Sequence, residues 1–279
     1  MEKRAEYITS RQNSLLVLAE KLCDRKHRRR EGLFRFDGRK LFCEALTSRV
    51  PLFAVLVCES TAPEIFALAA DFAWDPSSRV AVLPDSLFSR VSEEKSPEGV
   101  ICIAKCLDKI HKIVTIDKRT EVLSALSGER LLLLESVRDP GNLGTIIRSA
   151  RAFGVDTLML SADCADIYHQ RAIRAAMGTL FTQKILLAED LIGVVEELAK
   201  TRRVFAAALD ARAERLGAVS LRATDVAVIG NEGHGISAPL LDACTDRLYI
   251  PMEAGVESLN AGIAASVLLW EMYRGESHA

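Results

Sequence analysis

The stretch RDPGNLGTIIRSA, residues 138–150, decides how the second half of the chain is interpreted. It follows the run LLLLE at 131–135, which is typical of a buried strand. The Asp-Pro-Gly sequence then predicts a sharp turn, and Asn142 predicts the cap of a helix. Apolar side chains recur after it at helical spacing: Leu143, Ile146, Ile147 and Ala150. The stretch therefore predicts a strand, a tight turn and a helix, with Arg148 off the buried face.

The same pattern continues toward the end of the chain. Further short apolar runs occupy 157–160, 184–187, 203–208, 225–229 and 247–250. The segments between them mostly show helical spacing, and this alternation favours a parallel sheet covered on both faces. Ligands on such sheets bind beyond the carboxyl ends of the strands, so the turn after each run is a candidate site.

The first hundred residues predict a smaller α/β layer structure. Helices are expected at 11–23, 39–48 and 62–72, and strands at 33–36, 53–57, 79–83 and 100–104. Ser10 is the expected cap of the first helix. The polar mixture at 109–128 predicts a linker between a domain at 1–108 and a second domain at 129–279.

Composition excludes several classes of protein. The net charge of −2 argues against nucleic-acid binding through overall charge, although a local basic patch can still serve. The seven cysteines are scattered without a C-x-x-C pair, which favours reduced thiols over a zinc site or a disulfide framework. No apolar run approaches the roughly 20 residues of a membrane helix, and the amino terminus is charged. We expect a cytoplasmic protein without a metal.

Two further turns draw attention. In VAVIGNEGHGIS, residues 226–237, a strand runs into three glycines within six residues, which lets backbone approach a ligand closely. A merely flexible loop is the alternative interpretation, and the abrupt end of the strand favours binding. In RLYIPMEAGVESLNAGIAASVLLWEMYRG, residues 247–275, a strand stops at Pro251 and Ser258 is the expected cap of a long helix.

In order and spacing, these three turns resemble the motifs of the SpoU family of RNA 2′-O-ribose methyltransferases, within the SPOUT superfamily. The first family motif is an acidic residue, then D-P-x-N-x-G, then an arginine, and it is met by Glu135, Asp139, Pro140, Asn142, Gly144 and Arg148. The second, G-x-E-x-x-G, is met by Gly230, Glu232 and Gly235. The third, I-P-M followed by S-L-N, is met by Ile250 to Met252 and Ser258 to Asn260. RAAMGTLF, residues 174–181, resembles the block between the first two motifs, with Ala176 where a serine is common.

The resemblance implies a parallel-sheet SPOUT domain with a deep trefoil knot, which neither periodicity nor composition indicates. It also implies that the knotted loops bind S-adenosylmethionine. The cofactor-binding residues would be Gly230, Asn231, Glu232, Gly233, Ile250, Pro251, Met252, Ser258, Leu259 and Asn260.

The resemblance makes Arg148 the central catalytic residue, with the ribose and the arginine oriented by Asn142, Glu232, Ser258 and Asn260. A guanidinium stays protonated, so two roles remain open. Arg148 could act as a base activated by a substrate phosphate, or it could stabilise a developing alkoxide. Ser258 has a helix cap as its alternative role. His234 titrates near neutrality, but its position varies in the family pattern, so we interpret it as a loop residue.

The stretch RRREGLFRFDGRKLFCEAL, residues 28–46, resembles the amino-terminal RNA-binding domain of many family members. Between Lys21 and Lys40 lie nine basic residues against three acidic ones, a local surplus of six. Such a patch suits phosphate contact, and the expected RNA-binding residues are Arg28, Arg29, Arg30, Arg35 and Arg39. We interpret Phe34 and Phe36 as core residues of a strand, and stacking on RNA bases is the less favoured alternative.

The resemblance thus implies an S-adenosylmethionine-dependent RNA 2′-O-methyltransferase, and it also implies that the protein acts as a homodimer. The likeness of the amino-terminal domain to that of rRNA-modifying relatives favours ribosomal over transfer RNA. A tRNA methyltransferase and a catalytically silent RNA-binding or ribosome-assembly protein are the alternatives. A nucleotide-binding oxidoreductase is disfavoured, because no G-x-G-x-x-G follows any expected strand.

Overall fold

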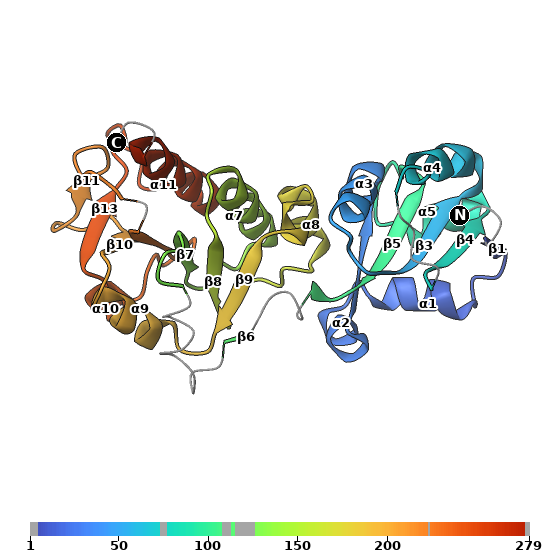
Figure 1. Cartoon of the computed structure of the whole chain (residues 1–279), viewed down its shortest axis with the longest axis horizontal. Helices are drawn as coiled ribbons and strands as arrows, with labels where there is room; N and C mark the ends of the chain where they lie inside the picture. Colours follow the sequence, from blue (N-terminus) through green and yellow to red (C-terminus); the bar gives the residue numbers. More distant parts are fainter. Residues whose placement is uncertain (1–4, 73–76, 108–112, 115–125, 223, 277–279) are drawn as a thin grey trace. The chain divides into compact units, whose positions relative to one another are not determined.

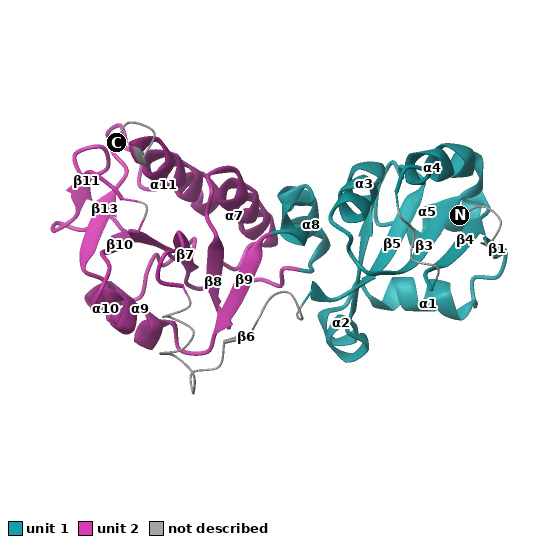
Figure 2. Cartoon of the chain, in the orientation of Figure 1, with its two compact units in different colours: residues 1–107, 168–182 teal, residues 108–167, 183–279 magenta. Residues whose placement is uncertain are grey.

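The computed structural model describes residues 5–72, 77–107, 113–114, 126–222 and 224–276 (Figure 1). The chain forms two compact units, one of residues 1–107 and 168–182 and the other of residues 108–167 and 183–279 (Figure 2). The sequence analysis kept all of 129–279 in the second domain, whereas 168–182 groups with the first unit. Most of the linker expected at 109–128 lies outside the described residues.

Within the described residues, the first unit contains a five-stranded sheet. Its strands, in spatial order, are β1 (Glu6–Tyr7), β4 (Arg79–Leu83), β3 (Leu52–Cys58), β5 (Val100–Lys105) and β2 (Leu33–Asp37). Strands β1, β4 and β3 pair in parallel, while β5 runs antiparallel to both β3 and β2. Its helices are α1 (Ser14–Lys21), α2 (Arg25–Glu31), α3 (Arg39–Thr47), α4 (Ala62–Ala69), α5 (Asp85–Val91) and α8 (Gln170–Ala176).

Two local expectations for this unit were wrong. Helix α1 is capped by Asn13, whose side chain accepts from the backbone N of Leu15 at 2.9 Å, and Ser10 lies outside the helix. The basic run forms helix α2, which the sequence analysis left without structure. Asp24 caps its start, and Gly32 ends it in the left-handed conformation that glycine favours. The basic residues of this segment drew the interpretation toward RNA binding, whereas the capping residues Asp24 and Gly32 indicate a helix.

Strand β2 is buried along its whole length, and residues 168–182 provide much of its cover. The ring of Tyr168 lies 4.7 Å from that of Phe34, and the ring of Phe181 lies 5.2 Å from that of Phe36. The side-chain amide of Gln170 donates to a β2 carbonyl at 3.0 Å. Phe34 and Phe36 are fully buried, which confirms them as core residues. These contacts explain why 168–182 belongs to the first unit.

The described residues of the second unit form an eight-stranded parallel sheet. In spatial order its strands are β11 (Glu214–Arg215), β13 (Asp246–Tyr249), β10 (Val204–Ala207), β12 (Val226–Ile229), β7 (Leu131–Leu134), β8 (Thr157–Ser161), β9 (Lys184–Ala188) and β6 (Ile113–Val114). All of their pairings are parallel. Each predicted apolar run is a strand within one or two residues, which confirms a parallel-sheet α/β domain. Leu131 to Leu134 are fully buried, because helices cover both faces of the sheet.

The helices of this unit are α7 (Pro140–Ala152), α9 (Leu191–Ala199), α10 (Ala238–Ala243) and α11 (Ala261–Glu276). Figure 1 shows α7 and α11 side by side on one face, and α9 with α10 on the other. The predicted buried face of α7 is confirmed, since all four of its apolar residues are fully buried. Its cap is Asp139, which accepts from the backbone N of Asn142 at 2.9 Å, so Asn142 lies inside the first turn instead. No helix in the described part of the chain has the length and apolarity needed to cross a membrane.

Candidate functional site

The loops that follow β7, β12 and β13 lie at one edge of the sheet, because parallel strands present their carboxyl ends together. The loop after β12 closes tightly on itself. Asn231 and Gly235 exchange two backbone hydrogen bonds of 2.9 Å each. A Cβ at Gly230 would lie 2.4 Å from the carbonyl carbon and oxygen of Gly235, so only glycine fits there.

Asn231 connects this loop to the first motif. Its side-chain amide donates to the carbonyl of Ser136 at 2.7 Å. Its side-chain oxygen accepts from the backbone N of Gly233 at 2.9 Å and of His234 at 3.1 Å. Asn231 therefore holds the loop in shape and joins it to the first motif. His234 is exposed in this loop.

A chain of hydrogen bonds joins all three motifs. The carboxylate of Glu232 accepts from the backbone N of Arg138 at 3.1 Å, from the backbone N of Asp139 at 3.0 Å, and from the side-chain amide of Asn142 at 3.0 Å. The side-chain oxygen of Asn142 accepts from the side-chain amide of Asn260 at 2.8 Å. The second motif is thereby fixed to the first, and the first to the third.

Asn260 is also the residue that caps α11. Its side-chain oxygen accepts from the backbone N of Gly262 at 3.0 Å and of Ile263 at 3.3 Å. The expected capping role of Ser258 was therefore wrong, since Ser258 lies before the helix and lines a cavity instead. Both the oxygen and the nitrogen of the Asn260 side-chain amide are hydrogen-bonded, so its orientation in the site is fixed.

Two carboxylates at this edge are held by donors. Burial raises the pKa of Glu232, but the hydrogen bonds from Asn142 and from the backbone of Asp139 outweigh it, and the pKa is lowered overall. Glu232 is therefore ionised at neutral pH. The carboxylate of Glu135 accepts from the backbone N of Ser237 at 2.7 Å and from its hydroxyl at 2.6 Å.

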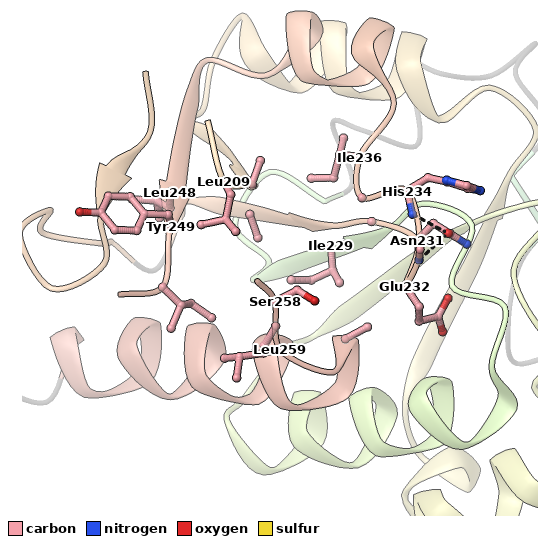
Figure 3. A pocket seen from close by; sticks show the side chains of 18 of the residues that line it. Leu209, Ile229, Asn231, Glu232, His234, Ile236, Leu248, Tyr249, Ser258 and Leu259 are labelled. Carbon is pink, nitrogen blue, oxygen red and sulfur yellow. Dashed lines mark hydrogen bonds between the residues drawn. The ribbon is translucent and has the colours of Figure 1, made fainter. Parts of the chain in front are cut away.

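Beside this network lies a cavity of about 400 Å³, shown in Figure 3. The expected cofactor residues that line it are Gly230, Asn231, Glu232, Gly233, Ile250, Met252, Ser258 and Leu259. Pro251 and Asn260 do not line it. The sequence analysis missed Leu209 and Tyr249, which follow or end strands β10 and β13. Their position at the carboxyl ends of two predicted strands was the available indication.

Arg148 stands apart from the cavity. It is exposed on α7, as predicted, and it does not line the cavity of its own chain. Within the part of the chain that the structure describes, its guanidinium makes no hydrogen bond or ion pair with a side chain. Asn142, Glu232 and Asn260 are thus brought together, and Ser258 lies at the adjoining cavity, while Arg148 remains outside this group.

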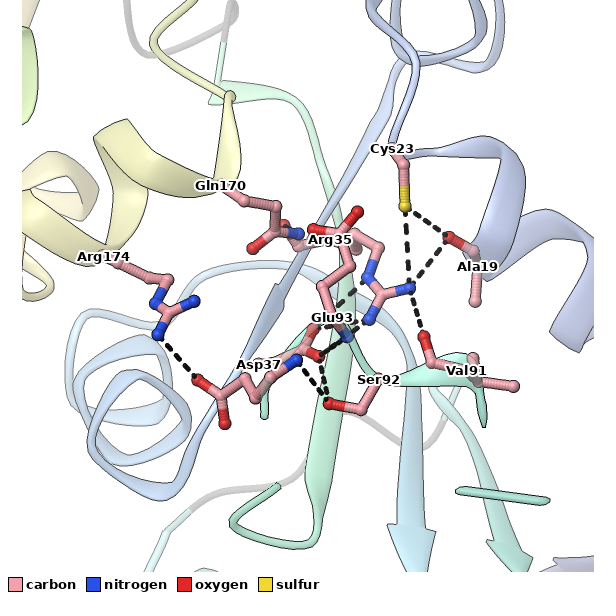
Figure 4. Close-up of polar contacts among 10 residues, drawn as sticks. Ala19, Cys23, Arg35, Asp37, Val91, Ser92, Glu93, Gln170 and Arg174 are labelled. Carbon is pink, nitrogen blue, oxygen red and sulfur yellow. Dashed lines mark hydrogen bonds and ion pairs between the residues drawn. The ribbon is translucent and has the colours of Figure 1, made fainter. Parts of the chain in front are cut away.

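The expected RNA-binding arginines divide into two kinds. Arg28 is buried and donates to the carbonyls of Leu22 and Cys23 at 2.8 and 2.7 Å. Arg35 is 1% exposed and forms a two-pronged ion pair with Asp37, at 2.7 and 2.8 Å (Figure 4). The expectation that these two arginines contact RNA was wrong, because their guanidinium groups are used inside the fold.

The other three arginines lie at the surface. Arg29 and Arg30 are exposed on α2, where Arg30 pairs with the neighbouring Glu31. Arg39 is half-buried and pairs with Glu64 at 2.7 Å. These three can reach a phosphate without loss of core contacts. Among the described residues, no group of three or more histidine, cysteine or acidic side chains could hold a metal ion.

Comparison with known proteins gives two family matches. Residues 129–270 match the SpoU rRNA Methylase family, and residues 14–102 match the MRM3-like substrate binding domain. The 23S rRNA (guanosine(2553)-2′-O)-methyltransferase RlmP of Bacillus subtilis (strain 168) is 29% identical over 266 residues, covering 95% of this chain and 98% of the relative.

Solved structures of RNA methyltransferases are also similar to this chain. A structure from Porphyromonas gingivalis, assigned to the TrmH family of RNA methyltransferases, has a TM-score of 0.77 at 28% identity, covering 94% of this chain and 98% of that one. An AdoMet-bound rRNA methyltransferase from Sinorhizobium meliloti has a TM-score of 0.77 at 26% identity, covering 97% and 98% of the two chains.

Proposed function

Because the chain belongs to the SpoU rRNA Methylase family, we propose that it transfers a methyl group from S-adenosylmethionine to a ribose 2′-oxygen of ribosomal RNA. The observation that carries this proposal is the hydrogen-bonded chain from Glu232 through Asn142 to Asn260. It joins three loops that are distant in sequence and holds them beside the cavity. Such preorganised polar groups next to a ligand-sized cavity are what positioning of two substrates requires.

The cavity suits S-adenosylmethionine in size and lining. Its volume of about 400 Å³ falls within the range of roughly 300–1,000 Å³ that is usual for small-molecule sites. Its walls combine apolar side chains, such as Ile229 and Leu248, with backbone groups of the glycine loop. The cofactor, when bound, supplies an electrophilic methyl group on a sulfonium. We propose that the loops at 230–235, 250–252 and 258–260 hold it, with a trefoil knot as in the rest of the family.

The chain's own residues must position the ribose hydroxyl, whose proton passes to solvent water as the methyl group is transferred. We propose that Asn142 and Glu232 fix the first motif loop, and that Arg148 acts on the hydroxyl. A permanently charged guanidinium stabilises the oxyanion that develops as the proton leaves. Support comes from the exposure of Arg148 and from the absence of a side-chain partner for it within the described residues.

We propose further that two copies of the chain form the active dimer. An apolar stripe on α11 remains exposed: Ile263, Val267, Trp270 and Tyr273 are between 37% and 53% exposed. An exposed stripe of this kind favours association. Since Arg148 does not line the cavity of its own chain, a site completed by a second copy fits its location on the neighbouring helix α7.

The first unit supplies the contact with RNA. Residues 14–102 match a substrate-binding domain, and the relative from Bacillus subtilis acts on 23S rRNA by its name. We propose that Arg29, Arg30 and Arg39 contact phosphates of a ribosomal RNA in the cytoplasm, with Arg28 and Arg35 supporting the fold beneath them. Contacts of this kind make RNA binding weaken as salt increases.

The test uses purified protein, radiolabelled methyl donor, and unmodified rRNA and tRNA transcripts, followed by digestion to nucleosides. We expect label on a ribose 2′-oxygen of rRNA and its loss in Arg148→Ala. The matched control is Arg151→Ala, which removes an exposed arginine from the last turn of the same helix. Label in tRNA alone would contradict the rRNA assignment. Cofactor binding without transfer to any RNA, including assembly intermediates, would favour the catalytically silent protein.

A further inference from the structure

Arg138 leaves the main chain beside the hydrogen-bonded chain of the site. It lies in the loop between β7 and α7, and its backbone N donates to Glu232 at 3.1 Å. Its side chain is 68% exposed. The hydrogen bond to Glu232 thus fixes the backbone of Arg138 at the site. The guanidinium at the end of the side chain faces solvent, at the edge of the sheet where the loops meet.

Asp163 orients this guanidinium. One Nη of Arg138 donates to the Asp163 carboxylate at 3.2 Å. The carboxylate also accepts from the hydroxyl of Ser136 at 2.5 Å and from that of Ser161 at 2.6 Å. Burial raises the pKa of Asp163, but these hydroxyls and Arg138 outweigh it and lower the pKa overall. Ser136 adopts a φ of 53°, an uncommon conformation for a residue with a side chain.

This arrangement contributes little to stability. An ion pair between two exposed side chains is weakened by solvent and adds little to stability. The guanidinium has five N–H groups, and its one hydrogen bond to a side chain within the described residues is the bond to Asp163. The remaining donors form a planar fork that matches two oxygens of a phosphate. The support from Asp163 thus orients a group that is still available to a ligand.

The charges at this edge show why such a cation matters. The loops after β7, β12 and β13 and the turn after β8 are all described, and they bring together the carboxylates of Glu135, Asp139, Asp163, Glu232, Glu253 and Glu257. In these four segments Arg138 is the side chain with a permanent positive charge. The loop after β10 ends at the same edge and adds Arg212, which is paired with Asp210 at 3.6 Å. An RNA strand that approaches these segments meets several carboxylates, which repel its phosphates. A positively charged side chain is therefore needed to bind a phosphate at this edge of the sheet.

We infer that Arg138 binds a phosphate of the RNA backbone next to the target ribose, and that Asp163 orients it for this contact. The inference rests on the proposed methyl transfer to RNA and adds a residue outside the family motifs. Arg138 thereby aligns the ribose with the cavity, a task separate from that of Arg148. No proton or methyl group passes through Arg138.

The test compares Arg138→Gln, Arg138→Lys and Asp163→Asn with Lys200→Gln as the matched control. Lys200 is exposed and pairs with Glu197 at 2.6 Å, but it follows α9, at the opposite edge of the sheet. RNA affinity is measured at several salt concentrations, together with KM and kcat for RNA and the Kd for S-adenosylmethionine. Arg138→Gln should raise the RNA Kd and KM about 10-fold. It should also reduce the slope of log affinity against log salt by about 0.7–0.9.

The conservative variants separate charge from geometry. Arg138→Lys should keep the salt slope of the wild type yet raise KM, because lysine keeps the charge without the planar fork. Asp163→Asn should do the same, since it leaves Arg138 charged but less well oriented. Lys200→Gln should change none of these values.

Several outcomes would overturn the inference. One is a salt slope for Arg138→Gln equal to that of Lys200→Gln, in an otherwise active enzyme. Another is a loss confined to RNAs with guanine at one position, which would indicate base recognition. A weaker affinity for S-adenosylmethionine with RNA binding unchanged would place Arg138 at the cofactor. The proposed function fails separately, if the wild type itself methylates no RNA.

Discussion

Replacing Gly230 with alanine tests whether the loop after β12 must close on itself for the cavity to form. A Cβ at this position lies 2.4 Å from the carbonyl carbon and oxygen of Gly235 and 2.5 Å from the backbone N of Ile236. Ordinary contacts begin near 3.4 Å, so the two arms of the loop must separate by about 1 Å. Because all three atoms belong to the backbone, no side-chain rotation can relieve the overlap.

The cost follows from this geometry. Overpacking of a closed site costs about 1–3 kcal/mol, and the separation also strains the paired hydrogen bonds between Asn231 and Gly235. If the loss falls on the form that binds the cofactor, affinity for S-adenosylmethionine drops about 5- to 150-fold. If 2 kcal/mol falls on the folded state, Tm drops by about 4–8 °C for a domain of this size.

The assay pairs thermal unfolding with calorimetric titration of S-adenosylmethionine. Gly233→Ala is the control within the same loop, since its Cβ would meet only the side-chain oxygen of Asn231, at 3.6 Å. Gly128→Ala is a second control, where a Cβ meets nothing within 4 Å. We expect both controls to unfold near the wild-type temperature. If Gly230→Ala also did so, and bound the cofactor as the wild type does, the close approach would not be required.

Three further predictions follow from the contacts. Asn142→Ala should lower the single-turnover methylation rate about 10- to 100-fold, because it breaks the hydrogen bonds to Glu232 and Asn260. Affinity for the cofactor should change little, since Asn142 does not line the cavity. A methylation rate equal to that of the wild type would contradict this prediction. Since the pKa of Glu232 is lowered, the stability it contributes is complete above its ordinary pKa and is lost as pH falls through the lowered value. The Tm of Glu232→Gln should therefore fall less than that of the wild type between neutral pH and about pH 3, and parallel curves would refute the assignment. Tyr168→Phe removes the buried hydrogen bond that the Tyr168 hydroxyl accepts from the backbone N of Leu107 at 2.5 Å. Urea unfolding should show that the free energy of unfolding falls by about 1–3 kcal/mol. An unchanged unfolding midpoint would mean that 168–182 does not stabilise the first unit.

The sequence predicted the strands of the second unit well, because uninterrupted runs such as Leu131–Leu134 can be buried only between two covering layers. It predicted helix starts poorly. Asn142, Ser258 and Ser10 were each expected to cap a helix, and Asp139, Asn260 and Asn13 do so instead. Neighbouring polar residues share the same capping preference, and the choice among them depends on which backbone N–H each side chain reaches.

Charge patterning was misleading in a similar way. Arg28 and Arg35 belong to a basic run that reads as a surface patch, yet both are buried. Arg35 lies on a strand whose neighbours at 34 and 36 were correctly interpreted as core. Its partner Asp37 is two residues away, on the same face of the strand, which was the available indication of a buried pair.

The sequence by itself determined the parallel α/β class of the second unit, the order of the three motifs and the residue types at the site. Only the tertiary structure decided which polar groups meet. Glu232 reaches the backbone of Arg138, 94 residues earlier in the chain, because β12 pairs with β7. Likewise, residues 168–182 join the first unit because their aromatic rings cover β2. Periodicity reports the burial of one element at a time, whereas strand order and the packing of distant segments depend on the whole chain at once.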